Sequence, residues 1–170
     1  ASDEPISFVS AMLASNETGV IQPIEVIVKG ADADGSLVHT DAAQAAGKMF
    51  LDLRTLGIDA MTVAPHKFHG PLGIGALVLR HGIELQPQLF GGFQQGGLRP
   101  GTENVALAVG FHEALRLAVT ELPERSERMR SLRDELERSL RAAIPDPGEM
   151  VIIGEDAPRL PNTSNVSFPG

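Results

Sequence analysis

The chain of 170 residues contains no cysteine, no tryptophan and no tyrosine. Without cysteine it has no disulfide, no thiolate zinc site and no cysteine nucleophile of its own. Phenylalanine, with seven residues, is the only large aromatic type, so the core must be built mostly from aliphatic side chains. Hydrophobic residues still make up 42% of the sequence, which is enough to bury a folded core.

Basic residues and long apolar runs are also scarce. The 14 lysines and arginines are outnumbered by 22 acidic residues, and the net charge of −8 argues against a nucleic-acid-binding surface. No apolar run approaches the roughly 20 residues of a membrane-spanning helix. The polar residues 1–5 lack the basic and apolar regions of a signal peptide. Together with the lack of disulfides, these features favour a cytoplasmic protein.

Short apolar runs alternate with short helical segments in the first half of the chain. Candidate strands lie at 6–13, 37–40, 61–64 and 74–80. Candidate helical segments lie at 24–29, where glycines from Gly30 onward are expected to end the helix, at 42–46 and at 52–56. This alternation predicts an α/β fold with a mostly parallel sheet and flanking helices.

Helical periodicity dominates beyond a glycine-rich loop at 88–101, which we expect to be packed and functional. Apolar residues recur at three- and four-residue steps from Val105 to Leu122 and predict one helix with a single apolar stripe. Pro123 suits the first turn of a second helix. The apolar residues expected on the buried side of that helix are Met129, Leu132, Leu136 and Leu140.

The end of the chain predicts a second structural unit. Glu137 and Arg141 have the i,i+4 spacing of an ion pair on the outer side of the second helix. Strands are predicted at 150–153 and 165–168, and Asn165 is expected to form a turn. We therefore predict that these strands belong to a second unit, which follows the helix that begins near Pro123.

Polar side chains follow three successive strands, at the edge where open α/β sheets bind ligands. They are Asn16, Asp41 with Gln44, and His66 with Lys67. A lysine that forms an imine and an aspartate that faces a pyridinium nitrogen are the two groups that pyridoxal phosphate (PLP) requires. The same residues have simpler interpretations, because an aspartate after a strand often caps a turn and a loop lysine is often solvated.

Other ligand sites are not expected. His66 and His69 have no carboxylate or third histidine nearby in the sequence, so we predict no metal site. The glycines within 70–75 precede a strand and not a helix, so they predict a tight turn and not a dinucleotide site.

Four motifs occur in the chain in the order of a known family. They are Asn16-Glu17-Thr18-Gly19, His39-Thr40-Asp41-Ala42-Ala43-Gln44, His66-Lys67 followed by Gly70-Pro71 and Gly73-Ile74-Gly75, and Arg99-Pro100-Gly101-Thr102-Glu103-Asn104. Together they resemble the cysteine desulfurase and selenocysteine lyase branch of the class V aminotransferase family. The resemblance extends over nearly the whole chain, from about Phe8 to Gly170.

The resemblance implies a fold and a function. The fold is that of PLP-dependent transferases of fold type I, with residues 1–122 as part of the PLP-binding large domain and residues 123–170 as a connecting helix and the start of a small α+β domain. The implied reaction removes sulfur from L-cysteine and gives alanine and an enzyme persulfide for iron–sulfur cluster or thio-cofactor assembly. The implied partners are a second subunit in a homodimer and a sulfur-acceptor or scaffold protein.

The resemblance also implies roles for individual residues. Lys67 matches the lysine that holds the cofactor covalently and then acts as the base for the α-proton. Asp41 matches the partner of the pyridine nitrogen, and Gln44 matches the residue that hydrogen-bonds the phenolic oxygen. Asn16 matches a residue that contacts the cofactor and the substrate carboxylate.

Two further matches concern the cofactor phosphate. His66 matches a ligand on the phosphate side and, with Lys67, completes the candidate catalytic pair. Thr102 matches a residue that reaches the phosphate bound in the other subunit. Ala64 stands where the family often has serine, so one phosphate hydrogen bond is expected to be missing.

Two alternatives remain beside the desulfurase. One is a selenocysteine lyase or another class V aminotransferase or lyase, and the other is a non-catalytic fragment that binds no cofactor. The sequence is predicted to be an internal segment of a longer enzyme. The family's phosphate loop is expected before Ala1, and its persulfide-forming cysteine and carboxylate-binding arginine are expected after Gly170.

Overall fold

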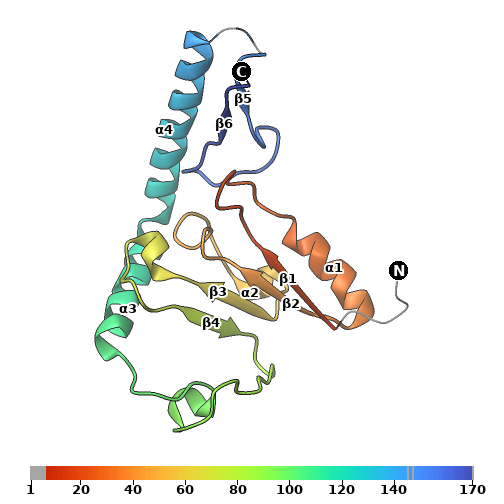
Figure 1. The fold of residues 1–170 in the computed structure, drawn as a ribbon, viewed down its shortest axis with the longest axis vertical. Helices are drawn as coiled ribbons and strands as arrows, with labels where there is room; N and C mark the ends of the chain where they lie inside the picture. The colour runs from red at the N-terminus through yellow and green to blue at the C-terminus, as the bar shows by residue number, and fades with distance from the viewer. Residues whose placement is uncertain (1–6, 145, 147, 170) are drawn as a thin grey trace.

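The computed structural model describes residues 7–144, 146 and 148–169. A four-stranded sheet with helices occupies the first part, and two long helices run along one side of it (Figure 1). Two predictions fall outside the described residues. They are the lack of signal-peptide features at residues 1–5 and the beginning of a strand at Ile6. The elements are β1 (Phe8–Met12), α1 (Ile24–Asp34), β2 (Leu37–Asp41), α2 (Leu53–Leu56), β3 (Ala60–Val63), η1 (Pro65–Phe68), β4 (Ala76–Leu79), η2 (Gln94–Gly97), α3 (Val105–Thr120), α4 (Leu122–Ala143), β5 (Val151–Ile152) and β6 (Val166–Ser167).

The main sheet has the order β1-β2-β3-β4 and confirms the predicted mostly parallel α/β architecture. β1, β2 and β3 are parallel, whereas β4 pairs with β3 in the antiparallel direction. In this register Asp41, the last residue of β2, lies beside Met12 of β1 and Thr62 of β3. The carboxyl ends of three strands therefore meet at one edge of the sheet.

The helix α1 packs on this sheet through Ile24, Val28 and Ala31, which are all buried. It continues to Asp34, so the prediction that it ends at Gly30 was wrong. A single glycine in a helix costs only about 1 kcal/mol, and the packed apolar face outweighs that cost. The helix ends at Gly35, which adopts a left-handed conformation with φ of 70°.

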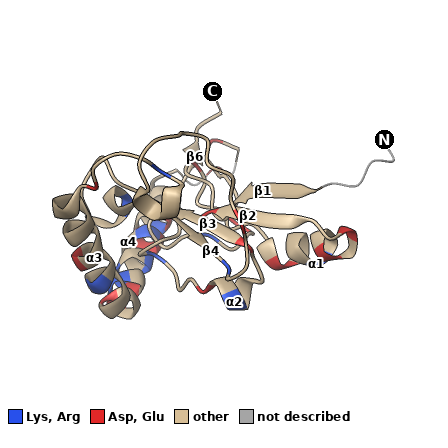
Figure 2. Cartoon of the chain, turned by 90° about the horizontal axis from the view of Figure 1, so that it is seen from below, with Lys and Arg blue, Asp and Glu red and all other residues tan. Residues whose placement is uncertain are grey.

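The helices α3 and α4 form an almost continuous column beside the sheet (Figure 1). The Asn104 side chain starts α3 by accepting a 3.1 Å hydrogen bond from the Leu107 amide. The predicted stripe on α3 is only partly correct, because Ala114 and Ala118 are buried while Val105 is 68% exposed. Residues of both charge signs are interleaved along α4 (Figure 2), and the pair Glu127–Arg130 is 2.9 Å apart.

The face of α4 predicted to be buried is largely exposed in the structure. Leu132 and Leu136 are 57% and 52% exposed, whereas Glu137 on the predicted outer face is buried. The strands β5 and β6 were predicted correctly and pair in the antiparallel direction beside α4 (Figure 1). None of the helices in the described ranges is long and apolar enough to cross a membrane.

Asp59 stabilises the junction between the strands. Its Oδ2 accepts a 2.7 Å hydrogen bond from the buried Val38 amide, and its carboxylate also forms an ion pair with Arg80. We expect Asp59→Ala to lower the free energy of unfolding by about 2 kcal/mol, because the buried amide loses its acceptor. Urea denaturation of the full-length polypeptide measures this change. Removal of the exposed Asp34 should change stability by less than about 0.5 kcal/mol, and equal effects at the two sites would contradict the assignment.

Candidate functional site

The carboxyl edge of the parallel strands brings together the residues that the sequence selected, with the exception of Thr102. Asn16 lies in an exposed turn that follows β1, and Asp41 is the final residue of β2. Lys67 lies on η1, which follows the end of β3 directly. Residues more than twenty positions apart therefore meet at one edge, because β1, β2 and β3 are parallel neighbours.

The Asp41 carboxylate is oriented by the loop that follows it. Its Oδ1 accepts a 2.8 Å hydrogen bond from the Ala43 amide, and the side chain is exposed at the sheet edge. The next turn is held by a 2.9 Å bond from the Ala46 amide to the Ala42 carbonyl. This turn places the Gln44 side chain on the same edge, partly buried, as an amide donor and acceptor.

The short helix η1 presents His66 and Lys67 to solvent while its other face is anchored. Pro65 and Phe68 are buried, and the ring of Phe68 lies 6.0 Å from that of Phe111 on α3. The buried Pro65 and Phe68 hold the backbone on either side of His66 and Lys67, and the Lys67 side chain remains exposed. Proline at the start suits a helical turn because its missing N–H needs no partner there.

Lys48 is a neighbour of Lys67 that the sequence reasoning missed. Its Nζ donates a 3.1 Å hydrogen bond to Oε1 of Gln44, and the side chain is half-buried. Burial, and to a smaller extent the positive charge of Lys67, lowers the pKa of the Lys48 amine. The available signal was the spacing of four residues between Gln44 and Lys48. The site thus contains a second amine beside Lys67, and the pKa of this Lys48 amine is lowered.

Thr102 is not brought to this edge. It lies between η2 and α3, in the long segment that extends away from the sheet below β4 (Figure 1). Within that segment Phe90 and Phe93 are 86% and 93% exposed, so the expectation of a packed loop was wrong for these residues. Thr102 borders a large open cavity of about 1100 Å³ between β4 and α3.

The side chains at the carboxyl edge fit the donor set that PLP requires. An exposed amine, an oriented carboxylate, an amide and an imidazole are supplied by Lys67, Asp41, Gln44 and His66. Each has the chemistry for a different part of the cofactor, namely the aldehyde, ring nitrogen, phenolic oxygen and phosphate. Among the described residues, no group of three histidine, cysteine or acidic side chains is arranged to hold a metal ion.

Comparison with known proteins gives one consistent family. The model of the aminotransferase class-V family matches residues 2–170. A cysteine desulfurase of Gluconacetobacter diazotrophicus is 45% identical over 159 residues, which cover 94% of this chain and 39% of that protein. A cysteine desulfurase of Nostoc sp. is 43% identical over 162 residues, which cover 95% of this chain and 40% of that protein.

Solved structures agree with the sequence relatives. A NifS-like protein from Rickettsia africae superposes with a TM-score of 0.91 at 32% identity, over 99% of this chain and 46% of that chain. A second NifS-like protein gives a TM-score of 0.87 at 40% identity, over 98% of this chain and 45% of that chain. The chain therefore spans about two-fifths of the length of the curated relatives it matches.

Proposed function

The chain belongs to the aminotransferase class V family, and from this membership we propose that it forms part of a PLP-dependent cysteine desulfurase. The observation that supports this proposal most strongly is the meeting of Asp41, Gln44 and Lys67 at one sheet edge, in a chain 45% identical to a cysteine desulfurase. The proposed reaction takes sulfur from L-cysteine and leaves alanine. The sulfur then passes to an acceptor or scaffold protein for iron–sulfur cluster or thio-cofactor assembly.

In this proposal each residue of the edge has a defined role. Bound PLP supplies an electron sink that weakens bonds at the α-carbon of the substrate. Lys67 holds the cofactor through Nζ and moves the α-proton. Asp41 keeps a proton on the ring nitrogen through its carboxylate, and Gln44 donates a hydrogen bond to the phenolic oxygen. Asn16 orients the substrate carboxylate.

The cofactor phosphate is assigned to two more residues. His66 binds it from the same subunit. Thr102 lies apart from the other candidate site residues of this chain. It is proposed to bind the phosphate of a second subunit, so the protein acts as a homodimer. Ala64 contributes only a methyl group beside this phosphate, in place of a hydroxyl donor. We further propose that residues 1–122 belong to the large domain and 123–170 to the start of the small one, in a cytoplasmic protein.

A turnover assay of the full-length polypeptide with L-cysteine and a thiol reductant tests this function. We expect alanine and sulfide in equal amounts, because the reductant releases the sulfur that leaves the substrate. Asp41→Asn keeps the size of the side chain but removes its charge, so it should lower turnover by about 100-fold. Release of selenide from selenocysteine without sulfide from cysteine would indicate a selenocysteine lyase. No spectral change on addition of PLP would indicate a non-catalytic protein.

A further inference from the structure

The residue that α4 buries is a glutamate. Glu137 is 6% exposed, although apolar side chains on the same helix remain in solvent. Burial of a carboxylate is costly unless it is paired and hydrogen-bonded, so the partners of Glu137 must account for its position.

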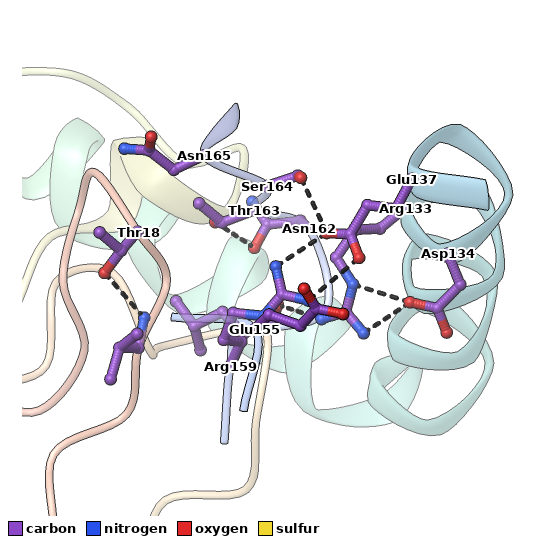
Figure 3. A network of polar contacts seen from close by, with 12 residues as sticks. Thr18, Arg133, Asp134, Glu137, Glu155, Arg159, Asn162, Thr163, Ser164 and Asn165 are labelled. Atoms are coloured by element: carbon purple, nitrogen blue, oxygen red, sulfur yellow. Dashed lines mark hydrogen bonds and ion pairs between the residues drawn. The ribbon is translucent and has the colours of Figure 1, made fainter. Parts of the chain in front are cut away.

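The partners of Glu137 come from the segment 158–165 (Figure 3). Arg159 donates from Nη1 to Oε1 at 2.8 Å and from Nη2 to Oε2 at 3.1 Å. Ser164 donates from Oγ to Oε1 at 2.8 Å. The hydrogen bond from Arg159 lowers the pKa of the Glu137 carboxyl, so this group is ionised at neutral pH. A bidentate pair of this kind fixes the orientation of the guanidinium relative to the carboxylate as well as the distance between them.

A second side chain of α4 reinforces this attachment. Nη1 of Arg133 donates a 2.9 Å hydrogen bond to the carbonyl of Leu160. Leu160 is itself 1% exposed and belongs to the core beneath β1 and α1. The segment 158–165 is thus inserted in the core by Leu160 and oriented from α4 by Arg133 and Glu137.

The other side of this segment supports the turn that contains Asn16. The Ile21 amide donates to the Pro158 carbonyl, and the Leu160 amide donates to the Gly19 carbonyl, both at 2.8 Å. These two bonds pair the end of the turn with segment 158–165 in the antiparallel direction, around the bridge between Val20 and Arg159.

Close packing adds a third constraint on the turn. A Cβ at Gly19 would lie 2.7 Å from Cβ of Thr163, so the backbone of the turn contacts this side chain directly. Nδ2 of Asn165 also donates to the Glu17 carbonyl at 3.4 Å. Segment 158–165 therefore holds Glu17, Gly19 and Ile21, which all follow Asn16 in the turn.

We propose that Glu137 is a positioning residue, which through Arg159 orients segment 158–165 and thereby fixes the turn that presents Asn16. The inference rests on the proposed function, in which Asn16 orients the substrate carboxylate. A buried ion pair adds little net stability compared with apolar residues of the same volume. Orientation of the loop explains why a charged pair occupies this site.

Hydrogen exchange of the full-length polypeptide without substrate tests the structural half of this proposal. Glu137→Gln keeps the shape of the side chain and removes its charge. We expect the amides of Ile21 and Leu160 to exchange at least tenfold faster, while exchange of the Leu13 amide, which donates to the backbone carbonyl of Asp41, is unchanged. Glu127→Gln on the same helix is the matched control, because its pair with Arg130 is exposed. Unchanged exchange at both reporter amides would overturn the proposal.

A double-mutant cycle with L-cysteine tests the functional half. Asn16→Ala and Glu137→Gln should each raise KM severalfold, and the double variant should resemble Asn16→Ala alone. Asp59→Asn, which weakens the fold away from segment 158–165, should leave KM unchanged. Independent, multiplying effects would show that Glu137 does not act through Asn16. If Asn16→Ala leaves KM unchanged, the proposed role of Asn16 is wrong, and hydrogen exchange alone then decides whether Glu137 positions the turn.

Discussion

Lys67→Ala is expected to abolish covalent retention of PLP by the full-length polypeptide and to lower desulfuration of L-cysteine by about 1000-fold or more. The proposed site loses both the amine that holds the cofactor and the base that moves the α-proton. Borohydride reduction of the wild-type protein, followed by peptide mass spectrometry, should place the trapped cofactor on the peptide that contains Lys67.

Within this chain the mapping has to distinguish three lysines. Lys29 lies exposed on α1 and is the control, since Lys29→Ala should change neither cofactor retention nor turnover. Lys48 is the rival, because burial and the charge of Lys67 lower the pKa of its amine. A trapped adduct on Lys48, or one that persists in Lys67→Ala, would show that the nucleophilic amine was assigned to the wrong residue.

Gly47→Ala is expected to be a strongly destabilising substitution despite the small size of alanine. Gly47 adopts φ of 74°, and a Cβ there would lie 2.6 Å from Cβ of Phe68 and 3.4 Å from Cβ of Ala118. The left-handed conformation costs about 1–2 kcal/mol and the overpacking about 1–3 kcal/mol, so we expect the free energy of unfolding to fall by about 3 kcal/mol. Because Phe68 anchors η1, the variant should also retain PLP more weakly.

Gly35→Ala is the matched control for this prediction. Gly35 has nearly the same φ, 70°, but an added Cβ would meet no atom within 4 Å. Gly35→Ala should therefore lower the free energy of unfolding by only about 1–2 kcal/mol, which is the conformational part of the cost. Urea denaturation of both variants separates the two contributions. Equal losses of unfolding free energy in the two variants would mean that the contact with Phe68 adds nothing to the cost of Gly47→Ala.

The edge of the sheet was predictable from the sequence because it depends on local patterns. Short apolar runs followed by polar residues predict strands and mark where they end, and the parallel order of β1, β2 and β3 follows from helical connections between them. The positions of Asp41, Gln44 and Lys67 at one edge could therefore be predicted. That Lys48 lies beside Lys67 could not, because it depends on how the turn at 43–48 packs against η1.

The faces of the helices show more clearly what could not be predicted from the sequence. Periodicity predicts that α4 has an apolar side, but it does not say what covers that side. In the described part of the chain Leu132 and Leu136 remain exposed, and Glu137 pairs with Arg159 instead of the expected Arg141. Arg141 pairs with Glu155 instead.

The sequence by itself determined the α/β class, the strand ends and the amine, carboxylate and amide that match a PLP site. Only the tertiary structure decided that Glu137 is buried against Arg159 and that Asn165 contacts the turn of Asn16 rather than merely forming a turn of its own. The physical reason is separation along the chain: neighbouring residues limit the backbone, whereas the partner of a buried charge is chosen by packing between segments far apart in sequence. Glu137 and Arg159 are joined in this way, and so are Asn165 and Glu17.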